Sequence, residues 1–303
     1  MNRSEVICVI VTFNREFLLQ KTLDSVLEQT FKIKKVIIID NNSSDNTYDI
    51  VRTLQNTHPI IEYHNTGANL GGAGGFYHGF KLASKYDYDY LWLMDDDLRP
   101  ECECLEKLID AADEDGIYQP VRFNLDGSCA ELSPIIYDLR NPFFMNPKRL
   151  SVLGLFKTST INKPFNIQGI PFEGPLISKK IVDNIGLPNP DFFIFYDDLD
   201  YSLRARNAGF KIMCIPDARA VRLLQNNQSN DLISWKGYFM LRNLFYIHRV
   251  YGENILVKIK PFILAFGYLG VSLCRFNFKQ ASIVFSAICD SGSLKNSDLH
   301  KPK

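Results

Sequence analysis

Histidine is scarce in this chain: of 303 residues only five are histidine, and none lies between His78 and His248. The seven cysteines are odd in number and include no Cys-x-x-Cys pair, so the sequence offers neither a disulfide framework nor a cysteine-based zinc motif. Such usage is typical of a reduced, cytosolic compartment. The net charge is zero, and we therefore expect no nucleic-acid partner.

Long uncharged apolar runs are also missing. The longest covers residues 261–274, which is too short to span a bilayer. A strand-like run begins at Val6 and leaves no room for a signal peptide, so we expect none. Acids are rare near the C-terminus, where residues 218–289 hold nine Lys or Arg and two Asp or Glu. This pattern favours helices lying on an anionic membrane surface, although helices that complete a core give it too.

Apolar runs rich in β-branched residues alternate with helical patterns over the first hundred residues. The runs at 6–13, 35–40, 60–64 and 90–94 predict buried strands, and helices are predicted after Asn14, near 47–54, at 71–84 and at 101–114. Such alternation predicts an α/β fold with a mostly parallel, Rossmann-like sheet flanked by helices.

The second half of the chain is less regular. Residues 118–165 show few periods and are predicted as loops and short strands. A helix near 199–207 and a strand at 211–215 follow, and long aromatic helices are predicted after Ser234. We therefore expect an α/β domain over 1–233 and a helical, basic and aromatic segment over 234–303, which we expect to contact a membrane surface.

Three consecutive carboxylates, Asp95, Asp96 and Asp97, follow the strand at 90–94. Ligands of open α/β sheets bind beyond the carboxyl ends of the strands, and alternation places Asp95 and Asp97 on one side. Hard oxygen ligands suit Mg²⁺ or Mn²⁺, which can bridge the phosphates of a nucleotide. The alternative is a solvated acidic turn.

Two further strand ends carry polar side chains. Thr12, Phe13 and Arg15 end the first strand, and Asp40 ends the second, at the same edge of the sheet as the acidic triplet. A carboxylate in the position of Asp40 can accept hydrogen bonds from a ribose or a base, or it can simply begin a polar turn. The coincidence of three such strand ends favours a nucleotide site.

A glycine-rich loop, Asn69-Leu-Gly-Gly-Ala-Gly-Gly75, precedes the third predicted helix. Backbone amides at a helix start can meet phosphate or sugar oxygens, and glycine permits close approach. The spacing matches neither a Walker loop nor a dinucleotide fingerprint, so a tight turn packed on the sheet is the alternative.

A second acidic cluster, formed by Asp197, Asp198 and Asp200, follows an aromatic run. Apolar neighbours raise the pKa of a carboxyl and make it a better general base, although capping of the next helix would also place an acid at Asp198. Glu173 could contact a sugar hydroxyl, but we expect it to have a structural role. On the aromatic helix after Ser234, Arg242 is expected to pair with a buried acid or to bind phosphate.

These motifs together resemble family 2 inverting glycosyltransferases of the GT-A fold, over about residues 5–250. They are Val-Thr-Phe-Asn-Arg, Val-Ile-Ile-Ile-Asp-Asn-Asn-Ser-Ser-Asp, Asn-Leu-Gly-Gly-Ala-Gly-Gly-Phe, Met-Asp-Asp-Asp and Phe-Tyr-Asp-Asp-Leu-Asp-Tyr. The glycine motif and the segment Tyr-Phe-Met-Leu-Arg-Asn look most like bacterial galactofuranosyltransferases, with rhamnosyltransferases as close relatives.

The resemblance implies a role for each site residue. Asp95 and Asp97 would hold Mn²⁺ or Mg²⁺, and Asp198 would be the base of a single, inverting displacement, with Asp197 and Asp200 orienting the acceptor. Donor binding would fall to Thr12, Phe13, Arg15, Asp40, Asn69, Gly72, Gly74, Gly75, Asp96 and Arg222. The family usually carries a histidine metal ligand at the place where this chain has Arg222, and that arginine would supply positive charge instead.

The resemblance also implies a UDP-sugar donor, with UDP-galactofuranose as first choice, and an acceptor glycan on a polyprenyl-diphosphate lipid. It places the protein peripherally on the cytoplasmic face of the bacterial inner membrane. Two alternatives stay open: a rhamnosyltransferase using dTDP-rhamnose, and a sugar-nucleotide-binding protein without turnover. The oligomeric state is not indicated by the sequence.

Overall fold

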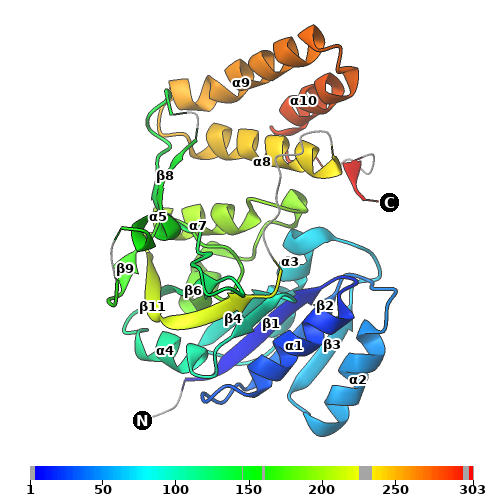
Figure 1. The fold of residues 1–303 in the computed structure, drawn as a ribbon, viewed down its shortest axis with the longest axis vertical. Helices are drawn as coiled ribbons and strands as arrows, with labels where there is room; N and C mark the ends of the chain where they lie inside the picture. The colour runs from blue at the N-terminus through cyan, green and yellow to red at the C-terminus, as the bar shows by residue number, and fades with distance from the viewer. Residues whose placement is uncertain (1–3, 145, 159–160, 225–233, 296–299, 303) are drawn as a thin grey trace.

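The computed structural model describes residues 4–302, except 145, 159–160, 225–233 and 296–299. Its core is one sheet of nine strands in the order β3-β2-β1-β4-β10-β6-β11-β5, with β9 paired to β11 (Figure 1). The strands are β1 (Val6–Thr12), β2 (Lys35–Asp40), β3 (Ile61–Asn65), β4 (Tyr90–Asp95), β5 (Leu98–Pro100), β6 (Gly116–Phe123), β9 (Phe165–Asn166), β10 (Leu176–Ser178) and β11 (Lys211–Arg222).

Strands β1 to β4 are parallel, as the alternating pattern predicts. The short strand β10 lies antiparallel between β4 and β6, and β11 returns parallel to β6. A mostly parallel sheet is therefore confirmed. Its register aligns Thr12 with Asp40 and Val11 with Asp95, so the polar ends of β1, β2 and β4 lie at one edge.

Helices cover both faces of the sheet, because its buried strands alternate their side chains between two apolar clusters. In β1, Val9 packs toward α3 and α7, and Ile10 packs toward α1 and α4. The helices of this part are α1 (Glu16–Leu27), α2 (Thr47–Thr57), α3 (Gly71–Ala83), α4 (Cys104–Asp110), α5 (Val152–Phe156), α6 (Lys179–Ile185), the 3-10 turn η1 (Pro190–Phe192) and α7 (Asp197–Asn207).

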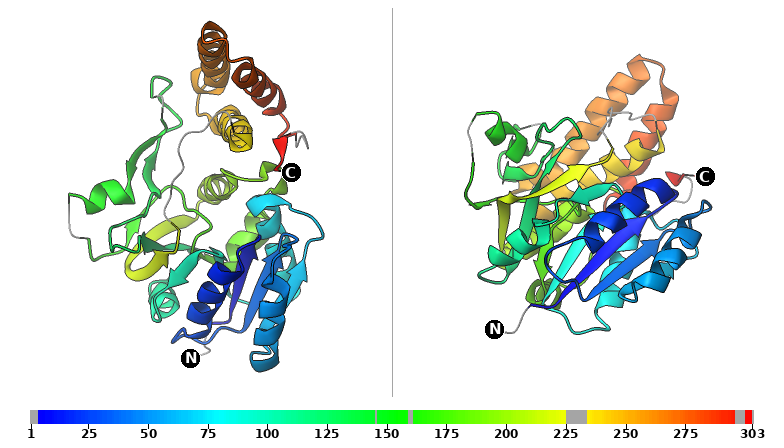
Figure 2. Two further views of the ribbon diagram at one scale, coloured as in Figure 1. Left: turned by 45° about the vertical axis from the view of Figure 1, so that its right-hand side comes forward. Right: turned by 60° about the horizontal axis from the view of Figure 1, so that its bottom comes forward.

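Three long helices, α8 (Trp235–Tyr251), α9 (Ile255–Cys274) and α10 (Phe278–Asp290), form a layer beyond α7 (Figures 1 and 2). Phe239 of α8 stacks on Phe193, with ring centroids 4.8 Å apart. A hairpin of β7 (Pro134–Tyr137) and β8 (Lys148–Ser151) stands beside these helices (Figures 1 and 2). The expected domain boundary at 233 lies outside the described residues and stays a prediction.

Several sequence-based expectations need correction. The loops and short strands predicted for residues 118–165 are present, but the prediction did not show that β6, most of which falls there, occupies the middle of the sheet. The fourth helix is shorter than residues 101–114, and β11 runs to Arg222 rather than ending at Ile215. A β-bulge between Ile215 and Arg219 breaks the alternating pattern in β11. The pattern therefore did not predict the part of the strand that follows Ile215.

The expectation that no segment is long enough to cross a membrane is also wrong. Helix α9 has 20 residues and a mean hydropathy of 1.6 in its most apolar window, so by length and composition it could span a bilayer. Two lysines, Lys258 and Lys260, interrupt the uncharged run in the sequence but do not end the helix. Only 33% of that window is buried within the protein.

Candidate active site

In the acidic triplet at the end of β4, Asp96 is held by several hydrogen bonds, whereas the Asp97 carboxylate has one longer contact with Arg15. The Asp96 carboxylate accepts hydrogen bonds from the Thr12 hydroxyl at 2.8 Å, the Phe13 amide at 3.3 Å and the Arg15 guanidinium at 3.0 Å. The Thr22 hydroxyl also donates to the Asp96 carbonyl oxygen at 2.8 Å. Asp96 therefore fastens the ends of β1 and β4 together, and this use leaves it little capacity for a ligand.

Asp95 and Asp97 are crowded by negative charge. Burial raises the pKa of the Asp97 carboxyl to about 6, and the charges of Glu173 and Asp96 act in the same direction. Burial, followed by the charge of Asp97, raises the pKa of Asp95 well above its usual value. The guanidinium of Arg15, 3.4 Å from the Asp97 carboxylate, offsets only part of this. Two like charges held together in this way favour a bound cation.

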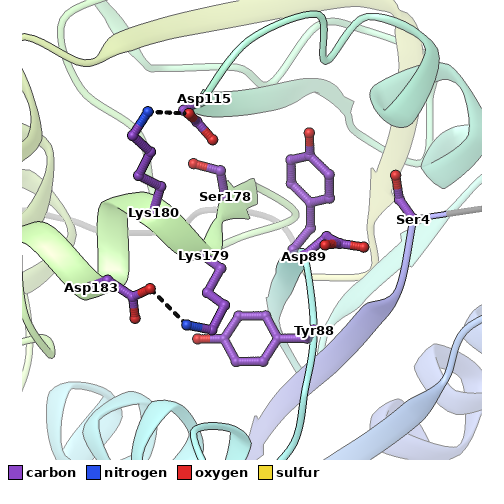
Figure 3. Close-up of a pocket in the computed structure, with 9 residues that line it drawn as sticks. Ser4, Tyr88, Asp89, Asp115, Ser178, Lys179, Lys180 and Asp183 are labelled. Carbon is purple, nitrogen blue, oxygen red and sulfur yellow. Dashed lines mark hydrogen bonds and ion pairs between the residues drawn. The ribbon is translucent and has the colours of Figure 1, made fainter. Parts of the chain in front are cut away.

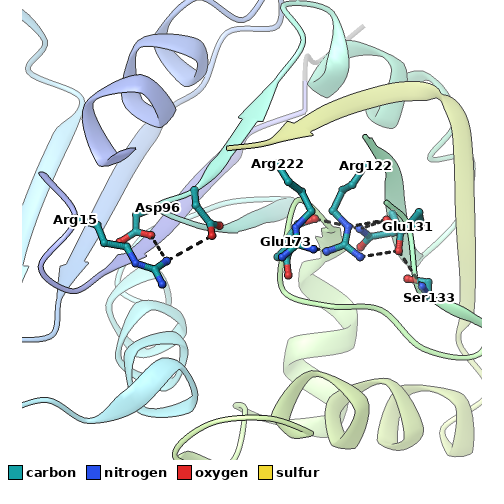
Figure 4. Close-up of polar contacts among 9 residues, drawn as sticks. Arg15, Asp96, Arg122, Glu131, Ser133, Glu173 and Arg222 are labelled. Atoms are coloured by element: carbon teal, nitrogen blue, oxygen red, sulfur yellow. Dashed lines mark hydrogen bonds and ion pairs between the residues drawn. The ribbon is translucent and has the colours of Figure 1, made fainter. Parts of the chain in front are cut away.

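On the other side of the acidic triplet, four charged residues form a network (Figure 4). Arg122 of β6 binds Glu131 with two of its nitrogens, at 2.7 and 2.9 Å, and it also pairs with Glu173. Arg222, at the end of β11, pairs with the same Glu173 at 3.1 Å. Glu173 thus joins two strand ends, as the structural reading of this residue expected.

Asp198 lies in the first turn of α7 and is half-buried. Burial raises the pKa of its carboxyl to about 6; a hydrogen bond from the Leu199 amide at 2.7 Å opposes the rise, and the charge of Glu173 adds to it. Because the charge of Glu173 acts on Asp95, Asp97 and Asp198, the structure brings the ends of β4 and the start of α7 to one site.

The backbone before Asp198 is strained. Phe193, Phe195 and Tyr196 have φ values of 63°, 66° and 68°, which side chains of this size rarely adopt. Asn243 of α8 holds this segment by donating from its amide to the carbonyl oxygens of Ile194 and Phe195, both at 2.8 Å. Strain of this kind persists only where surrounding contacts enforce it, and it is concentrated at functional sites.

The neighbouring acids differ from Asp198. Asp200 pairs with Arg204 at 3.0 Å and accepts a hydrogen bond from the Tyr251 hydroxyl at 2.5 Å, so its carboxylate is already occupied. Asp197 is buried, and burial, followed by the charge of Asp198, raises the pKa of its carboxyl well above the usual value. Of the three, Asp198 has the carboxylate best placed to act on a ligand.

Asp40 is buried at the end of β2, where the Tyr63 hydroxyl donates to it at 2.5 Å and the Ser43 amide at 2.8 Å. Burial, followed by the hydrogen bond to Asp40, raises the pKa of Tyr63 to about 12. Phe13, the residue after the Thr12 that is paired with Asp40, is 38% exposed. Asp40 therefore keeps a fixed orientation at the edge where Phe13 offers an open aromatic face.

The glycine loop is explained in large part by packing. A side chain at Gly71 would collide with the Phe193 carbonyl, one at Gly74 with Leu70, and one at Gly75 with Val11 of β1. Gly72 faces open space, and Asn69 caps the turn by accepting from the Gly71 amide at 2.9 Å. The tight-turn alternative thus accounts for Gly71, Gly74 and Gly75, while Gly72 alone presents an open backbone.

Sequence reasoning missed the β7–β8 hairpin. Burial lowers the pKa of its Lys148, and the charges of Asp198 and Glu131 oppose that effect. Burial raises the pKa of Tyr137, and the charges of Tyr196 and Asp198 raise it further. No motif marked these residues, because they are brought to Asp198 by tertiary packing of a region with little periodicity.

Arg242 of α8 binds backbone carbonyl groups among the described residues, and its expected contact with an acid or a phosphate stays a prediction. It is fully buried, and its guanidinium donates to the carbonyl oxygens of Asp191 at 2.7 Å, Phe192 at 2.9 Å and Lys295 at 2.9 Å. It therefore ties the aromatic segment before α7 to the C-terminal end of the chain.

A hollow of about 520 Å³ lies at the opposite edge of the sheet, where β4 begins (Figure 3). Its two lysines are already paired, Lys179 with Asp183 at 2.6 Å and Lys180 with Asp115 at 2.8 Å. The hollow is thus separate from the acids at the carboxyl ends of the strands.

A family model described as "Glycosyl transferase family 2" matches residues 7–167, which include β1 to β4 and the acidic triplet. The chain belongs to glycosyltransferase family 2. Among curated proteins, this family member is 31% identical over 221 residues to galactofuranosyltransferase GlfT1 of Mycolicibacterium smegmatis, covering 69% of this chain and 68% of that protein. It is also 23% identical to the dTDP-rhamnosyl transferase RfbF of Shigella flexneri over 86% of each chain.

Solved structures show the same fold at low identity. The glycosyltransferase GalNAc-T7, crystallised with UDP, GalNAc and Mn²⁺, matches with a TM-score of 0.58 at 14% identity, over 86% of this chain and 54% of that one. The mannosyltransferase PcManGT of Pyrobaculum calidifontis, in complex with GDP-Man and Mn²⁺, matches with a TM-score of 0.57 at 16% identity. The match covers 98% of this chain and 77% of that one. The expected GT-A fold and glycosyltransferase class are confirmed.

The residues at the end of β4 fit a divalent cation in part. Asp95 and Asp97 supply hard oxygen ligands whose mutual repulsion a cation would relieve. Within the described residues no group of three His, Cys, Asp or Glu side chains could close a metal site. A cation here would thus need oxygen ligands from a donor diphosphate or from water.

Proposed function

We propose that this protein is an inverting glycosyltransferase that moves galactofuranose from UDP-galactofuranose to a hydroxyl of a lipid-linked bacterial surface glycan. The similarity to GlfT1 supports the donor, and the similarity to RfbF makes dTDP-rhamnose the second candidate. The observation that carries the proposal is Asp198, a half-buried carboxylate with a pKa near 6. The charge of Glu173 acts on it as it does on Asp95 and Asp97 at the end of β4.

In this proposal Asp198 is the general base. A carboxylate of this pKa is ionised at neutral pH and yet basic enough to accept the proton of an acceptor hydroxyl. The hydroxyl oxygen forms the new bond to the anomeric carbon as the bond to the diphosphate breaks on the opposite face. This single displacement inverts the configuration. Asp200, already held by Arg204 and Tyr251, maintains the first turn of α7.

The donor would lie along the ends of β1, β2 and β4. Asp40 and the open face of Phe13 suit a ribose and base, and Gly72 leaves room beside them. Asp95 and Asp97 would hold a divalent cation, which when bound would neutralise charge on the departing diphosphate. Arg15 fixes the adjoining turn. Arg222 adds positive charge at the end of β11 but shares it with Glu173.

Product analysis tests the proposal. The protein is incubated with UDP-galactofuranose or dTDP-rhamnose, Mn²⁺ and membrane-extracted lipid-linked glycans, and the products are analysed by mass spectrometry and by NMR of the anomeric centre. We expect transfer from UDP-galactofuranose with inversion. Transfer from dTDP-rhamnose alone would select the second donor. UDP binding without any product, unchanged in the Asp198→Asn variant, would instead support a non-catalytic binding protein.

We further propose that α9 and α10 rest on the membrane that carries the acceptor. Side chains spaced along one face of α9 are strongly exposed, among them Ile255 at 69%, Ile263 at 64% and Phe266 at 74%. Phe276, between the helices, is 81% exposed. An apolar face of this extent next to Lys258, Arg275 and Lys279 suits an anionic lipid surface.

Vesicle flotation tests this contact with the full chain. We expect wild-type protein to float with vesicles containing phosphatidylglycerol, and the Ile263→Ser/Phe266→Ser double variant to stay in solution. The matched control is Leu125→Ser, which removes a side chain of 63% exposure from the turn after β6. Equal flotation of all three proteins would contradict the proposal.

A further inference from the structure

The β7–β8 hairpin presents Lys148 to the same site as Asp198. In the antiparallel register Lys148 is opposite Tyr137, and opposed residues of such a pair project from the same face. Tyr137 is buried in an apolar cluster with Leu199 of α7. The face that carries Lys148 is therefore turned toward the first turn of α7.

The Lys148 side chain is half-buried, and the one hydrogen bond that Lys148 donates among the described residues comes from its backbone amide and not from its ammonium. Burial of a cation without a partner is unfavourable, and here it lowers the pKa of Lys148. The attraction of Asp198 and Glu131 compensates in part, from beyond contact distance. A further anion beside the ammonium would complete its partners.

Lys148 is on the base side of the site and not on the donor side. The largest charge effects on both Asp95 and Asp97 come from Glu173, Asp96 and Arg15, with Asp97 acting also on Asp95 and Arg222 on Asp97. Lys148 instead acts on Asp198. An anion bound by Lys148 would consequently lie on the side where an acceptor must approach.

The other end of the hairpin is tied to α9. Asn254, which caps α9, donates to the Arg140 carbonyl oxygen at 2.6 Å, and the ammonium of Lys260 donates to the Phe144 carbonyl oxygen. Phe143, between them in the chain, is 87% exposed. The hairpin thus connects the exposed apolar face of α9 with Asp198.

From this arrangement we propose that Lys148 binds a phosphate of a lipid-linked acceptor, so that the sugar next to that phosphate reaches Asp198 while the lipid follows the hairpin toward α9. The inference rests on the proposed function and adds to it the residue, Lys148, that binds the phosphate between the acceptor glycan and its lipid. Charge-assisted hydrogen bonds to phosphate suit an ammonium in this place.

The test measures binding of three probes by calorimetry, with UDP and Mn²⁺ present so that the donor side is filled. The probes are farnesyl diphosphate, farnesol and inorganic pyrophosphate. We expect farnesyl diphosphate to bind wild-type protein and to bind Lys148→Gln about tenfold more weakly, with affinity restored in Lys148→Arg. Farnesol should bind both proteins equally, and pyrophosphate should bind more weakly than the lipid diphosphate.

The matched control is Arg149→Gln, which removes the same charge one residue away at an exposed position. Its affinity for farnesyl diphosphate should equal that of wild type. Unchanged affinity in Lys148→Gln, or equal weakening in Arg149→Gln, would overturn the proposal. Pyrophosphate binding as tightly as farnesyl diphosphate would also overturn it, because the anion would then be recognised without its lipid.

Failure of the proposed function has a different signature. UDP should bind wild-type and Lys148→Gln protein equally, since Lys148 is placed away from the donor. Absence of UDP binding to wild-type protein would refute the donor site itself. Normal UDP binding with Lys148-independent binding of farnesyl diphosphate would refute only the role of Lys148.

Discussion

The pH dependence of transfer gives the sharpest test of Asp198. With a pKa near 6, about nine-tenths of this carboxyl is ionised at pH 7 and about one-tenth at pH 5. If Asp198 is the base, kcat/KM for the acceptor should fall about tenfold over that interval. An unshifted aspartate would stay mostly ionised throughout and give a flat profile.

The Asp198→Asn variant should lose about 10²- to 10⁴-fold in kcat, which is the usual contribution of a general base. Its remaining activity should lose the inflection near pH 6. The matched control is Asp191→Asn, the same substitution at an exposed aspartate before α7. That variant should keep both the rate and the pH profile of wild type.

Initial rates are measured from pH 5 to 8 at saturating Mn²⁺ and donor, because Asp97 also has a pKa near 6 when no cation is bound. UDP affinity is measured at each pH to separate donor binding from the chemical step. The reasoning is refuted if Asp198→Asn keeps more than a tenth of wild-type kcat, or if wild-type kcat/KM is flat to pH 5.

Three other expectations concern stability. Asp198→Asn should raise the free energy of unfolding by on the order of 1 kcal/mol at pH 7.5 and leave it nearly unchanged at pH 4. The raised pKa of Asp198 in the folded state disfavours folding only where the carboxyl is ionised. Urea denaturation at both pH values measures the difference. Arg122→Met should lower stability by about 3–5 kcal/mol in the same assay, because it strands the buried carboxylate of Glu131, whereas Lys157→Met at an exposed position should change it by less than about 0.5 kcal/mol. Thr12→Val should cost about 1.5–3 kcal/mol by removing the hydroxyl that donates to Asp96, and a melting temperature equal to wild type would contradict the tying role of Asp96.

The sequence predicted the first half of the fold well, because β1 to β4 are buried on both faces and therefore appear as continuous apolar runs. It failed at β6, where Pro120, Arg122 and the neighbouring Gln119 interrupt the apolar pattern of a strand in the middle of the sheet. Arg122 is tolerated there only because Glu131 and Glu173 pair with it, and neither pairing is marked by a local sequence pattern.

The same reason separates the predicted site residues from the missed ones. Asp95, Asp97 and Asp198 follow strands or begin helices, so local pattern places them near a ligand edge. Lys148 and Glu131 reach the site through long-range packing, which no local pattern reports. Conversely, Thr12 and Asp96 were predicted to bind donor, and the structure shows them bonded to each other.

The charges of the assembled site bear on the missing histidine. Six carboxylates face four basic groups: Asp95, Asp96, Asp97, Glu131, Glu173 and Asp198 against Arg15, Arg122, Arg222 and Lys148. A sugar diphosphate would add further negative charge to a site that is already negative. Arg222 cannot balance it alone, because Glu173 holds it at 3.1 Å. The loss of a neutral histidine ligand thus removes coordination but not the electrostatic need for a cation, and turnover should cease in EDTA and return with Mn²⁺.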